Sequence, residues 1–265
     1  MNATRGSPSR KSSAAPLSAF VLHSWDWSET SLIVELFTRE RGRVVVVAKG
    51  AKRPYSQLRP VLLPFQRLQV QLGRAPADEH AEVHLLRTAE RAGGPPMPAG
   101  SALFAGFYLN ELLLKLLARL DPHEALFDAY ADTVASLQGA DEAGVQLTLR
   151  CFELLLLRAL GVLPELHVQT LTVQALEPDA RYTLHPEAGV QHSHDGVAGA
   201  ALVGIEAALA SGHLHALRQA VRPAMAALRQ PLRQVLHYHL GTPQLRTRQV
   251  MLDLQKLTDR ETPRP

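Results

Sequence analysis

The chain has 265 residues, 46% of them hydrophobic, and a formal net charge of +3, which suits one large domain or two modest ones with a real core. Its single cysteine, Cys151, excludes a disulfide framework within the chain and a zinc site built from several thiolates, and it favours a reducing cytoplasm. No apolar run approaches the roughly 20 residues needed to cross a bilayer, so no membrane partner is expected.

The charge is distributed unevenly along the chain. Residues 1–90 contain 13 basic and 8 acidic side chains, whereas residues 91–265 contain 15 and 17. Within the second part, residues 218–265 contain nine basic and three acidic side chains. Two basic zones around a more acidic middle are compatible with an extended anionic partner such as nucleic acid.

The N-terminal third is typical of a small β-structure. Residues 1–16 are polar and small, and we expect a disordered tail there rather than a signal peptide. Residues 17–92 then contain five strand-like stretches: SAFVLHSW, TSLIVELFT, RVVVVAK, FQRLQVQLG and HAEVHLLRTAE. Five short antiparallel strands predict a small closed barrel or a sandwich, with the OB-fold as one option. The valines at 44–47 do not alternate with polar residues, which predicts burial on both faces.

A glycine- and proline-rich break at residues 91–100 marks the expected domain boundary, and a mainly helical domain follows over residues 93–265. We expect Asp121 to cap one helix and Gly161 to end the next, with a kink or a break near Pro231. A small hairpin-like, irregular insert is expected around residues 165–195, and PQLRTRQVMLDLQKL is expected to form a last short helix. The predicted fold class is therefore α+β.

Sequence motifs for enzymatic chemistry are missing. The chain contains no GxxxxGK[ST], GxGxxG, HExxH or GxSxG pattern. His192 and His194, beside Asp195, invite a metal site, but no strong ligand spacing recurs upstream, and we interpret them as structural or exposed histidines. Cys151 lies in an apolar helix and is predicted to be a buried, inert thiol. We expect no catalytic residue and no metal. The alternative of a hydrolase that uses the histidine cluster would require a bound metal ion.

The richest feature is a basic run in which Glu40 is the only acid, made of Arg39, Arg41, Arg43, Lys49, Lys52, Arg53, Arg59 and Arg67. Cationic side chains neutralise phosphates without reading base sequence. Aromatic rings stack on unpaired bases, and Trp25, Trp27 and Tyr55 lie in the same part of the chain. On the residues alone, the opposite interpretation is equally good: the rings pack in the core and the basic side chains only solvate a hairpin tip.

The sequence resembles the bacterial DNA repair protein RecO family over nearly all of its length after residue 16. The segments that carry the resemblance are AFVLHSWDWSETSLIVELFTRERGRVVVVAKGAKRP, LLPFQRLQVQLG, LRTAE, FAGFYLNELLLKLL, LRCFELLLLRALG and LGTPQLRTRQVM. The resemblance implies an N-terminal OB-fold, a helical C-terminal domain and a recombination mediator that is not an enzyme. Many members carry a four-cysteine zinc module in the insert, but PELHVQTLTVQ contains no cysteine, so neither zinc nor another cofactor is expected.

The resemblance also implies partners and activities. Such proteins bind single- and double-stranded DNA without sequence specificity, anneal complementary strands, and help load the recombinase RecA on DNA coated by the single-stranded DNA-binding protein, in the RecF pathway. The implied protein partners are RecR, the acidic C-terminal tail of the single-stranded DNA-binding protein, and RecF. A cytoplasmic, nucleoid-associated protein is expected. The alternative is an adaptor that binds only protein, with the barrel as a docking module.

The resemblance favours the phosphate-binding interpretation of the basic run. The predicted DNA contacts are Arg43, Lys49, Lys52, Arg53 and Arg59, with Arg246 and Arg248 as a second contact. Arg150, in the helical part, is predicted to meet the acidic peptide tail. Its alternative role is an exposed charge on an amphipathic helix.

Overall fold

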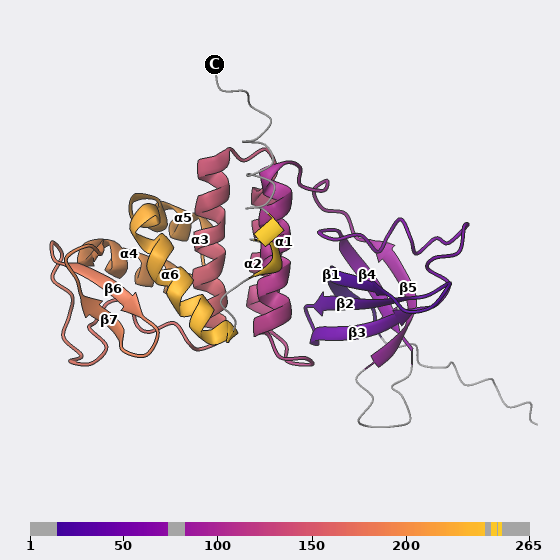
Figure 1. Cartoon of the computed structure of the whole chain (residues 1–265), viewed down its shortest axis with the longest axis horizontal. Helices are drawn as coiled ribbons and strands as arrows, with labels where there is room; N and C mark the ends of the chain where they lie inside the picture. The colour runs from indigo at the N-terminus through magenta and orange to yellow at the C-terminus, as the bar shows by residue number, and fades with distance from the viewer. Residues whose placement is uncertain (1–14, 74–82, 242–244, 248, 251–265) are drawn as a thin grey trace, which may run out of the picture.

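The computed structural model describes residues 15–73, 83–241, 245–247 and 249–250. Figure 1 shows a β-barrel at one end, helices in the middle and a small sheet at the far end. The α+β fold class, with a five-stranded barrel followed by a helical region, is thereby confirmed. Most of the predicted tail, Arg248 and most of the predicted last helix lie outside the described residues. Within the described ranges, no helix is long and apolar enough to cross a membrane.

The barrel is closed, with the strand order β1-β2-β3-β5-β4. Its strands are β1 (Leu17–Asp26), β2 (Leu32–Thr38), β3 (Gly42–Ala48), β4 (Arg67–Leu72) and β5 (Val83–Arg91). The expectation of purely antiparallel strands is wrong, because β3 and β5 run parallel. A ring with an odd number of strands has no arrangement in which every neighbour alternates in direction. At least one pair must therefore be parallel.

Three of the four valines of β3 are buried, as the missing alternation predicted, and Val47 is half-buried. Val44 and Val46 are 1% and 0% exposed and belong to the barrel core, while Val45 on the opposite face is only 5% exposed. Gly42, which begins the strand, has a φ of 65°. A Cβ atom at this position would lie 1.9 Å from the carbonyl oxygen of Asp121, so glycine allows the chain of the helical part to pass directly against the barrel.

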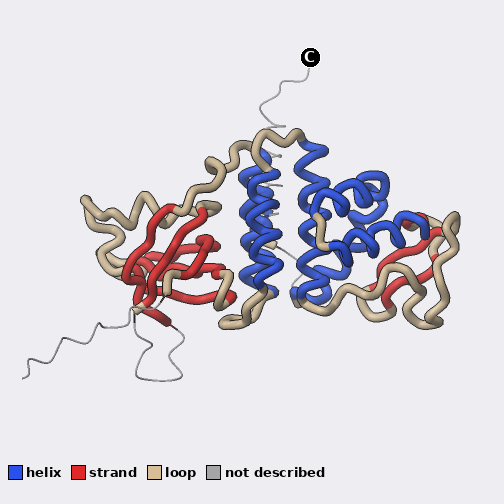
Figure 2. The backbone as a smooth tube through the Cα atoms, turned by 180° about the vertical axis from the view of Figure 1, so that it is seen from behind, coloured by secondary structure: helices blue, strands red, loops and turns tan. Residues whose placement is uncertain are grey.

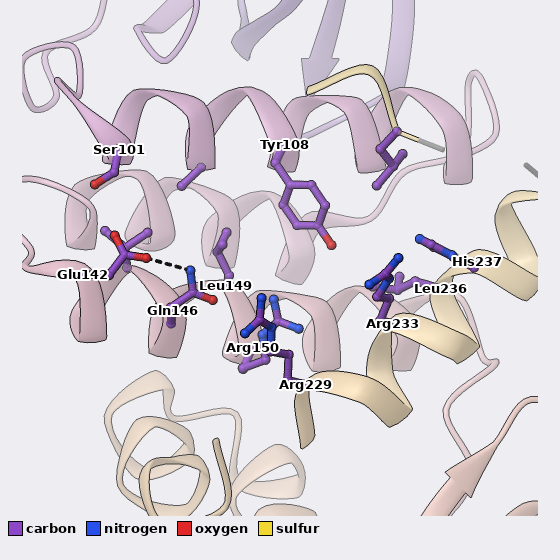
Figure 3. A pocket seen from close by; sticks show the side chains of 13 residues that line it. Ser101, Tyr108, Glu142, Gln146, Leu149, Arg150, Arg229, Arg233, Leu236 and His237 are labelled. Atoms are coloured by element: carbon purple, nitrogen blue, oxygen red, sulfur yellow. Dashed lines mark hydrogen bonds between the residues drawn. The ribbon is translucent and has the colours of Figure 1, made fainter. Parts of the chain in front are cut away.

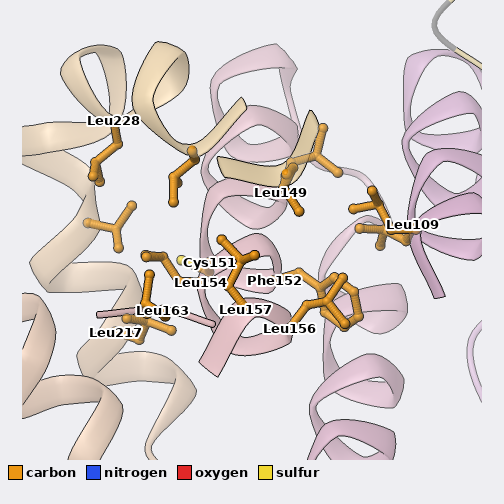
Figure 4. Close-up of a cluster of buried hydrophobic side chains, with 14 of the residues drawn as sticks. Leu109, Leu149, Cys151, Phe152, Leu154, Leu156, Leu157, Leu163, Leu217 and Leu228 are labelled. Carbon is orange, nitrogen blue, oxygen red and sulfur yellow. The ribbon is translucent and has the colours of Figure 1, made fainter. Parts of the chain in front are cut away.

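The helical part stands beside the barrel, as the view from behind in Figure 2 also shows. Its helices are α1 (Ser101–Leu116), α2 (Glu124–Ser136), α3 (Glu142–Ala159), α4 (Gly199–Ser211), α5 (Leu214–Val221) and α6 (Met225–Leu240), with a 3-10 turn at Arg222–Ala224. The central helix α3 is apolar on most sides, and the leucines around Phe152 fill the core shown in Figure 4. Cys151 is buried as predicted, and burial raises the pKa of its thiol to about 12.

The start of α2 differs from the prediction. His123, not Asp121, is the N-cap residue, and the helix begins at Glu124. The chain just before it is held by the barrel: the Leu120 amide donates to the carbonyl oxygen of Arg43 at 2.9 Å. This long-range pairing overrides the local capping signal, because residues bound to a strand are not free to take helical dihedral angles.

Two further elements are more regular than predicted. Helix α6 is continuous through Pro231, which is buried, because Leu228, Leu232 and Leu236 pack on both sides of the proline at 0–1% exposure. The packing therefore offsets the missing backbone hydrogen bond. The insert contains a three-stranded sheet of β6 (Arg181–His185), β7 (Gly189–His192) and β8 (Val197–Ala198), in the order β7-β6-β8.

Candidate functional site

The loop that connects β3 to β4 carries most of the predicted DNA contacts. We call residues 49–59 the basic loop. Lys49, Arg53 and Arg59 are exposed there, and none of the three side chains forms a hydrogen bond or ion pair with any residue that the structure describes. Gly50, with a φ of 73°, turns the chain sharply after the buried strand. Three unneutralised cations at the end of a barrel form a surface that attracts anions.

Lys52 has a different position from its neighbours. Its Nζ atom donates to Asp26 Oδ2 at 2.8 Å and to the carbonyl oxygen of Ser28 at 3.1 Å, and its backbone amide donates to the carbonyl oxygen of Thr30 at 3.0 Å. These contacts fasten the basic loop to the β1–β2 hairpin. Lys52 therefore positions the loop, and its charge is partly neutralised by Asp26.

The prediction that Arg43 contacts DNA is wrong. Arg43 is only 8% exposed and its guanidinium forms an ion pair with Glu35, which is 2% exposed. The Arg43 Nε atom lies 2.9 Å from Glu35 Oε1, and Nη1 donates to the carbonyl oxygen of Leu117 at 2.6 Å. The side chain points from the barrel toward the end of α1 rather than to solvent. Its donors are occupied by a buried carboxylate and by carbonyl groups that α1 leaves unpaired.

The predicted second contact lies in the helical part. Arg246 is exposed, and its backbone amide donates to Glu111 Oε1 of α1 at 2.9 Å. The amide and hydroxyl of Thr247 donate to Glu111 Oε2 at 2.9 and 2.7 Å. Burial would raise the pKa of Glu111, but these hydrogen bonds, together with one from Lys115, outweigh burial and lower it below its ordinary value of 4.5. Glu111 thus holds the segment that carries Arg246 against α1.

Glu111→Gln is expected to loosen this segment by about 1–3 kcal/mol, because a charged acceptor of several hydrogen bonds becomes neutral. The folded-state pKa is lowered, so the carboxylate stabilises the docked segment above pH 4.5, and that stabilisation is lost as the pH falls through the folded-state pKa. Hydrogen exchange at the amides of Arg246 and Thr247 measures the effect. Equal protection of these amides in Glu111→Gln and in the unmodified protein, both above and below pH 4.5, would contradict the role of Glu111 in holding this segment.

The helical part also contains a cavity of about 160 Å³ with an apolar floor and a basic wall. Leu149 of α3 and Leu236 of α6 contribute to the floor, and Figure 3 shows the guanidinium groups of Arg150, Arg229 and Arg233 converging on the space. Of these three arginines, only Arg150 was predicted from the sequence to be a binding residue. Arg229 and Arg233 are four residues apart and therefore lie on one face of α6, which is the signal that could have found them.

Arg150 is held in place from behind. It is 8% exposed, so the alternative of an exposed surface charge is wrong. Its Nη1 atom lies 2.8 Å from Oε2 of the buried Glu153, and Tyr108 Oη donates to the other carboxylate oxygen at 2.8 Å. Burial raises the pKa of Glu153, against the opposing influence of Arg150 and Tyr108. Arg150 is therefore fixed at the wall of the cavity.

The structure decides the alternative left open for the aromatic residues, and it places the two neighbouring histidines. Trp25, Trp27 and Tyr55 are 44%, 64% and 94% exposed, so they do not fill the barrel core. The rings of His192 and His194 lie 6.3 Å apart in the insert. Over the ranges described, no three histidine, cysteine or acidic side chains are grouped closely enough to hold a metal ion.

Comparisons with known proteins agree along the whole fold. The family description "Recombination protein O N terminal" matches residues 15–90, and "Recombination protein O C terminal" matches residues 97–249. Proteins named DNA repair protein RecO are 52% identical in Verminephrobacter eiseniae over 245 residues and 52% identical in Variovorax paradoxus over 254 residues. Each comparison covers 90% of this chain and 96% of the relative. The chain therefore belongs to the RecO family of DNA repair proteins.

Proposed function

We propose that the protein binds DNA through the basic loop without sequence specificity, anneals complementary single strands, and helps load a recombinase on strands coated by single-stranded DNA-binding protein. The observation that carries the proposal is the exposure of Lys49, Arg53 and Arg59 on one loop of the barrel, with none of these side chains neutralised by a described residue. Such cations bind phosphates of any sequence and release the counterions condensed on them.

The mechanism that we propose is charge neutralisation. Two DNA strands repel each other, and a basic surface lowers this repulsion enough for complementary bases to pair. Base pairing itself supplies the free energy, so no bond is made or broken by the protein and no catalytic residue is required. We accordingly propose a mediator that is not an enzyme and that acts without a cofactor, on DNA in the cytoplasm.

A strand-annealing assay tests this function. Two complementary oligonucleotides, one labelled, are mixed with the protein, first bare and then coated with single-stranded DNA-binding protein. We expect faster annealing in both cases, with the acceleration falling as salt increases, because the contacts are to phosphates. Annealing rates that the protein leaves unchanged at low salt would contradict the proposal.

We propose that the cavity between α1, α3 and α6 receives the acidic C-terminal tail of the single-stranded DNA-binding protein. Its apolar floor suits a hydrophobic side chain, and Arg229 and Arg233 stand where carboxylates of the peptide would lie. Arg150 is pre-positioned by Glu153 and would lose little side-chain freedom on binding. RecR and RecF remain proposed partners without an assigned surface.

Arg229→Ala with Arg233→Ala is expected to weaken binding of an acidic C-terminal peptide by about 100-fold or more, since charge-assisted contacts contribute about 1.5–3 kcal/mol each. Fluorescence anisotropy with a labelled peptide measures the affinity. Arg222→Ala, an exposed arginine that does not line this cavity, is the matched control. Equal affinities for the double variant and the control would exclude the cavity as the binding site.

The alternative function is an adaptor that binds only protein. The exposed cations of the basic loop do not favour it. Basic side chains that only kept a loop soluble could equally well be paired with acidic ones, but no described residue neutralises Lys49, Arg53 or Arg59. A mobility-shift assay with a single-stranded oligonucleotide at two salt concentrations separates the two functions. No salt-sensitive shift at either concentration would support the adaptor.

A further inference from the structure

Three aromatic side chains are exposed in or beside the basic loop, whereas most of the other described aromatic residues are buried or half-buried, Tyr238 in α6 being exposed at 53%. Trp27 and Tyr55 are 64% and 94% exposed, whereas Tyr130 and Tyr182 are 0% and 1% exposed. The chain contains two tryptophans, and both of them, Trp25 and Trp27, lie in the β1–β2 hairpin. Exposed rings of this size leave a large apolar area in water. Such an area indicates an interaction surface, because these rings do not pack in the core.

Among the described residues, the end of β1 that carries Trp25 has a strand partner on one side only. Strand β1 pairs with β4 only over residues 17–20, while its last residues pair with β2, Trp25 lying opposite Ile33. The ring of Trp25 is held edge-on against His23, with the ring centroids 4.5 Å apart. Trp27 follows at the tip of the hairpin. Trp25 thus lies where β2 is the only described strand beside β1, with Trp27 in the turn that follows, while β2 itself pairs with β3 on its other side.

The basic loop is joined to this hairpin, so cations and rings belong to one surface. The contacts of Lys52 with Asp26, Ser28 and Thr30 bind the loop to the hairpin tip. Tyr55 lies in the next turn, which is closed by a hydrogen bond from the Ser56 amide to the carbonyl oxygen of Arg53 at 3.0 Å. The almost fully exposed phenol is therefore two residues from an exposed guanidinium.

We infer that this surface, formed by Trp25, Trp27 and Tyr55, is a stacking site for the unpaired bases of single-stranded DNA. The inference rests on the proposed DNA binding and adds what charge neutralisation lacks, namely a preference for single strands. Phosphates are present on both single and double strands, but the faces of the bases are available only when they are unpaired. The neighbouring cations favour a nucleic acid over an apolar peptide as the occupant, because they match a phosphate backbone.

The site has a consequence for annealing. A strand whose bases are stacked on the protein is held extended, with its phosphates on the basic loop. Pairing with a complementary strand removes the bases from the rings. The surface therefore binds the substrate of annealing more tightly than the product, which allows the duplex to leave.

Trp27→Ala and Tyr55→Ala are expected to weaken binding of single-stranded oligonucleotides by about 5- to 100-fold each, as measured for base–aromatic stacking elsewhere. Binding of duplex DNA and the slope of affinity against salt should stay unchanged, because no cation is removed. Because both side chains are largely exposed, the variants should also keep the unfolding temperature of the original chain. Trp27→Phe, which preserves a ring, should restore most of the affinity.

Two further measurements separate stacking from charge. An oligonucleotide with abasic sites keeps every phosphate and should bind the original chain about as weakly as the normal oligonucleotide binds the variants. Tryptophan emission reports on this hairpin alone, and we expect single strands to quench it and duplexes to leave it unchanged. Equal binding of abasic and normal strands, or losses that are equal for single strands and duplexes, would overturn the stacking site.

The outcomes also distinguish this inference from the proposed function. If a variant with Lys49, Arg53 and Arg59 replaced by alanine loses DNA binding while the aromatic variants do not, the stacking site is wrong and the DNA-binding proposal stands. If the original chain binds neither strands nor duplexes at low salt, the proposed function itself is wrong. Loss of RecR binding in the aromatic variants, with normal affinity for single strands, would reassign the surface to a protein and so overturn the stacking site.

Discussion

Arg43→Ala is expected to destabilise the fold by about 3–5 kcal/mol, because it leaves a buried carboxylate without its partner. Glu35 is 2% exposed and lies between the barrel and α1, and its described ionic contacts are Arg43 and, at 3.5 Å, Arg119. The variant also leaves the carbonyl oxygens of Leu114 and Leu117 without the donor that now joins α1 to the barrel. Urea unfolding followed by circular dichroism measures the change.

Two control variants test whether the loss of stability comes from the unpaired buried carboxylate. Arg119→Ala removes a side chain that is 44% exposed and lies 3.5 Å from Glu35, and it should cost less than Arg43→Ala because Glu35 keeps its closer partner. Arg43→Met with Glu35→Leu removes both buried charges and should be more stable than Arg43→Ala alone. If Arg43→Ala were no less stable than Arg119→Ala, the buried pair would not hold the two parts of the molecule together.

The basic-loop variant Lys49→Ala, Arg53→Ala, Arg59→Ala is expected to lower the slope of log affinity against log salt by about two units on single-stranded DNA, or about 0.7 for each lost phosphate contact. Between about 50 and 200 mM salt, the original chain should accordingly lose about 10- to 30-fold more affinity than the variant. The effect should be the same for every base sequence, because phosphates carry none. Fluorescence titrations with labelled oligonucleotides at several salt concentrations provide the slope.

The control for this prediction removes charge from another region. Arg181 and Arg222 are exposed in the helical part, and their replacement by alanine lowers the net charge without touching the basic loop. Their replacement should leave the slope nearly unchanged. A basic-loop variant that folds normally and retains the original slope would falsify the assignment of this loop to DNA. The effect of Lys52→Ala on DNA binding should differ from that of the basic-loop variant and from that of the control. This substitution frees the loop from the hairpin as well as removing a charge.

Local patterns in the sequence were sufficient for much of the fold. The run of four valines predicted a strand buried on both faces, and the change to helical spacing after residue 100 predicted the helical part. The predictions that were wrong all involve contacts between elements. Asp121 has the chemistry of an N-cap, but the residues before it pair with β3, and Pro231 did not break α6 because packing on both sides holds the helix.

The candidate site was harder to predict, because the sequence does not distinguish a solvent-exposed charged side chain from one that is paired with a buried partner. Arg43 and Arg53 both belong to the basic run, yet Arg43 is paired with Glu35 while Arg53 is exposed. The pairing of Val45 with Glu35 across β2 and β3 brings that carboxylate near the arginine. The burial of Arg43 against Glu35 depends on the register of the two strands and on the packing of α1 against the same face of the barrel.

The sequence by itself determined five strands followed by helices, the burial of Cys151 and the basic character of one loop, because periodicity, turn residues and charge are properties of neighbours along the chain. The family followed from the resemblance of whole segments, and the choice of a closed barrel over a sandwich from the structure. The tertiary structure decided which cations are available to an anion, that Trp27 and Tyr55 face solvent, and that Arg229 and Arg233 join Arg150 around one cavity. These are contacts between residues far apart in sequence. They depend on how complete elements pack, and packing is fixed by burial and shape over the whole molecule rather than by any local pattern.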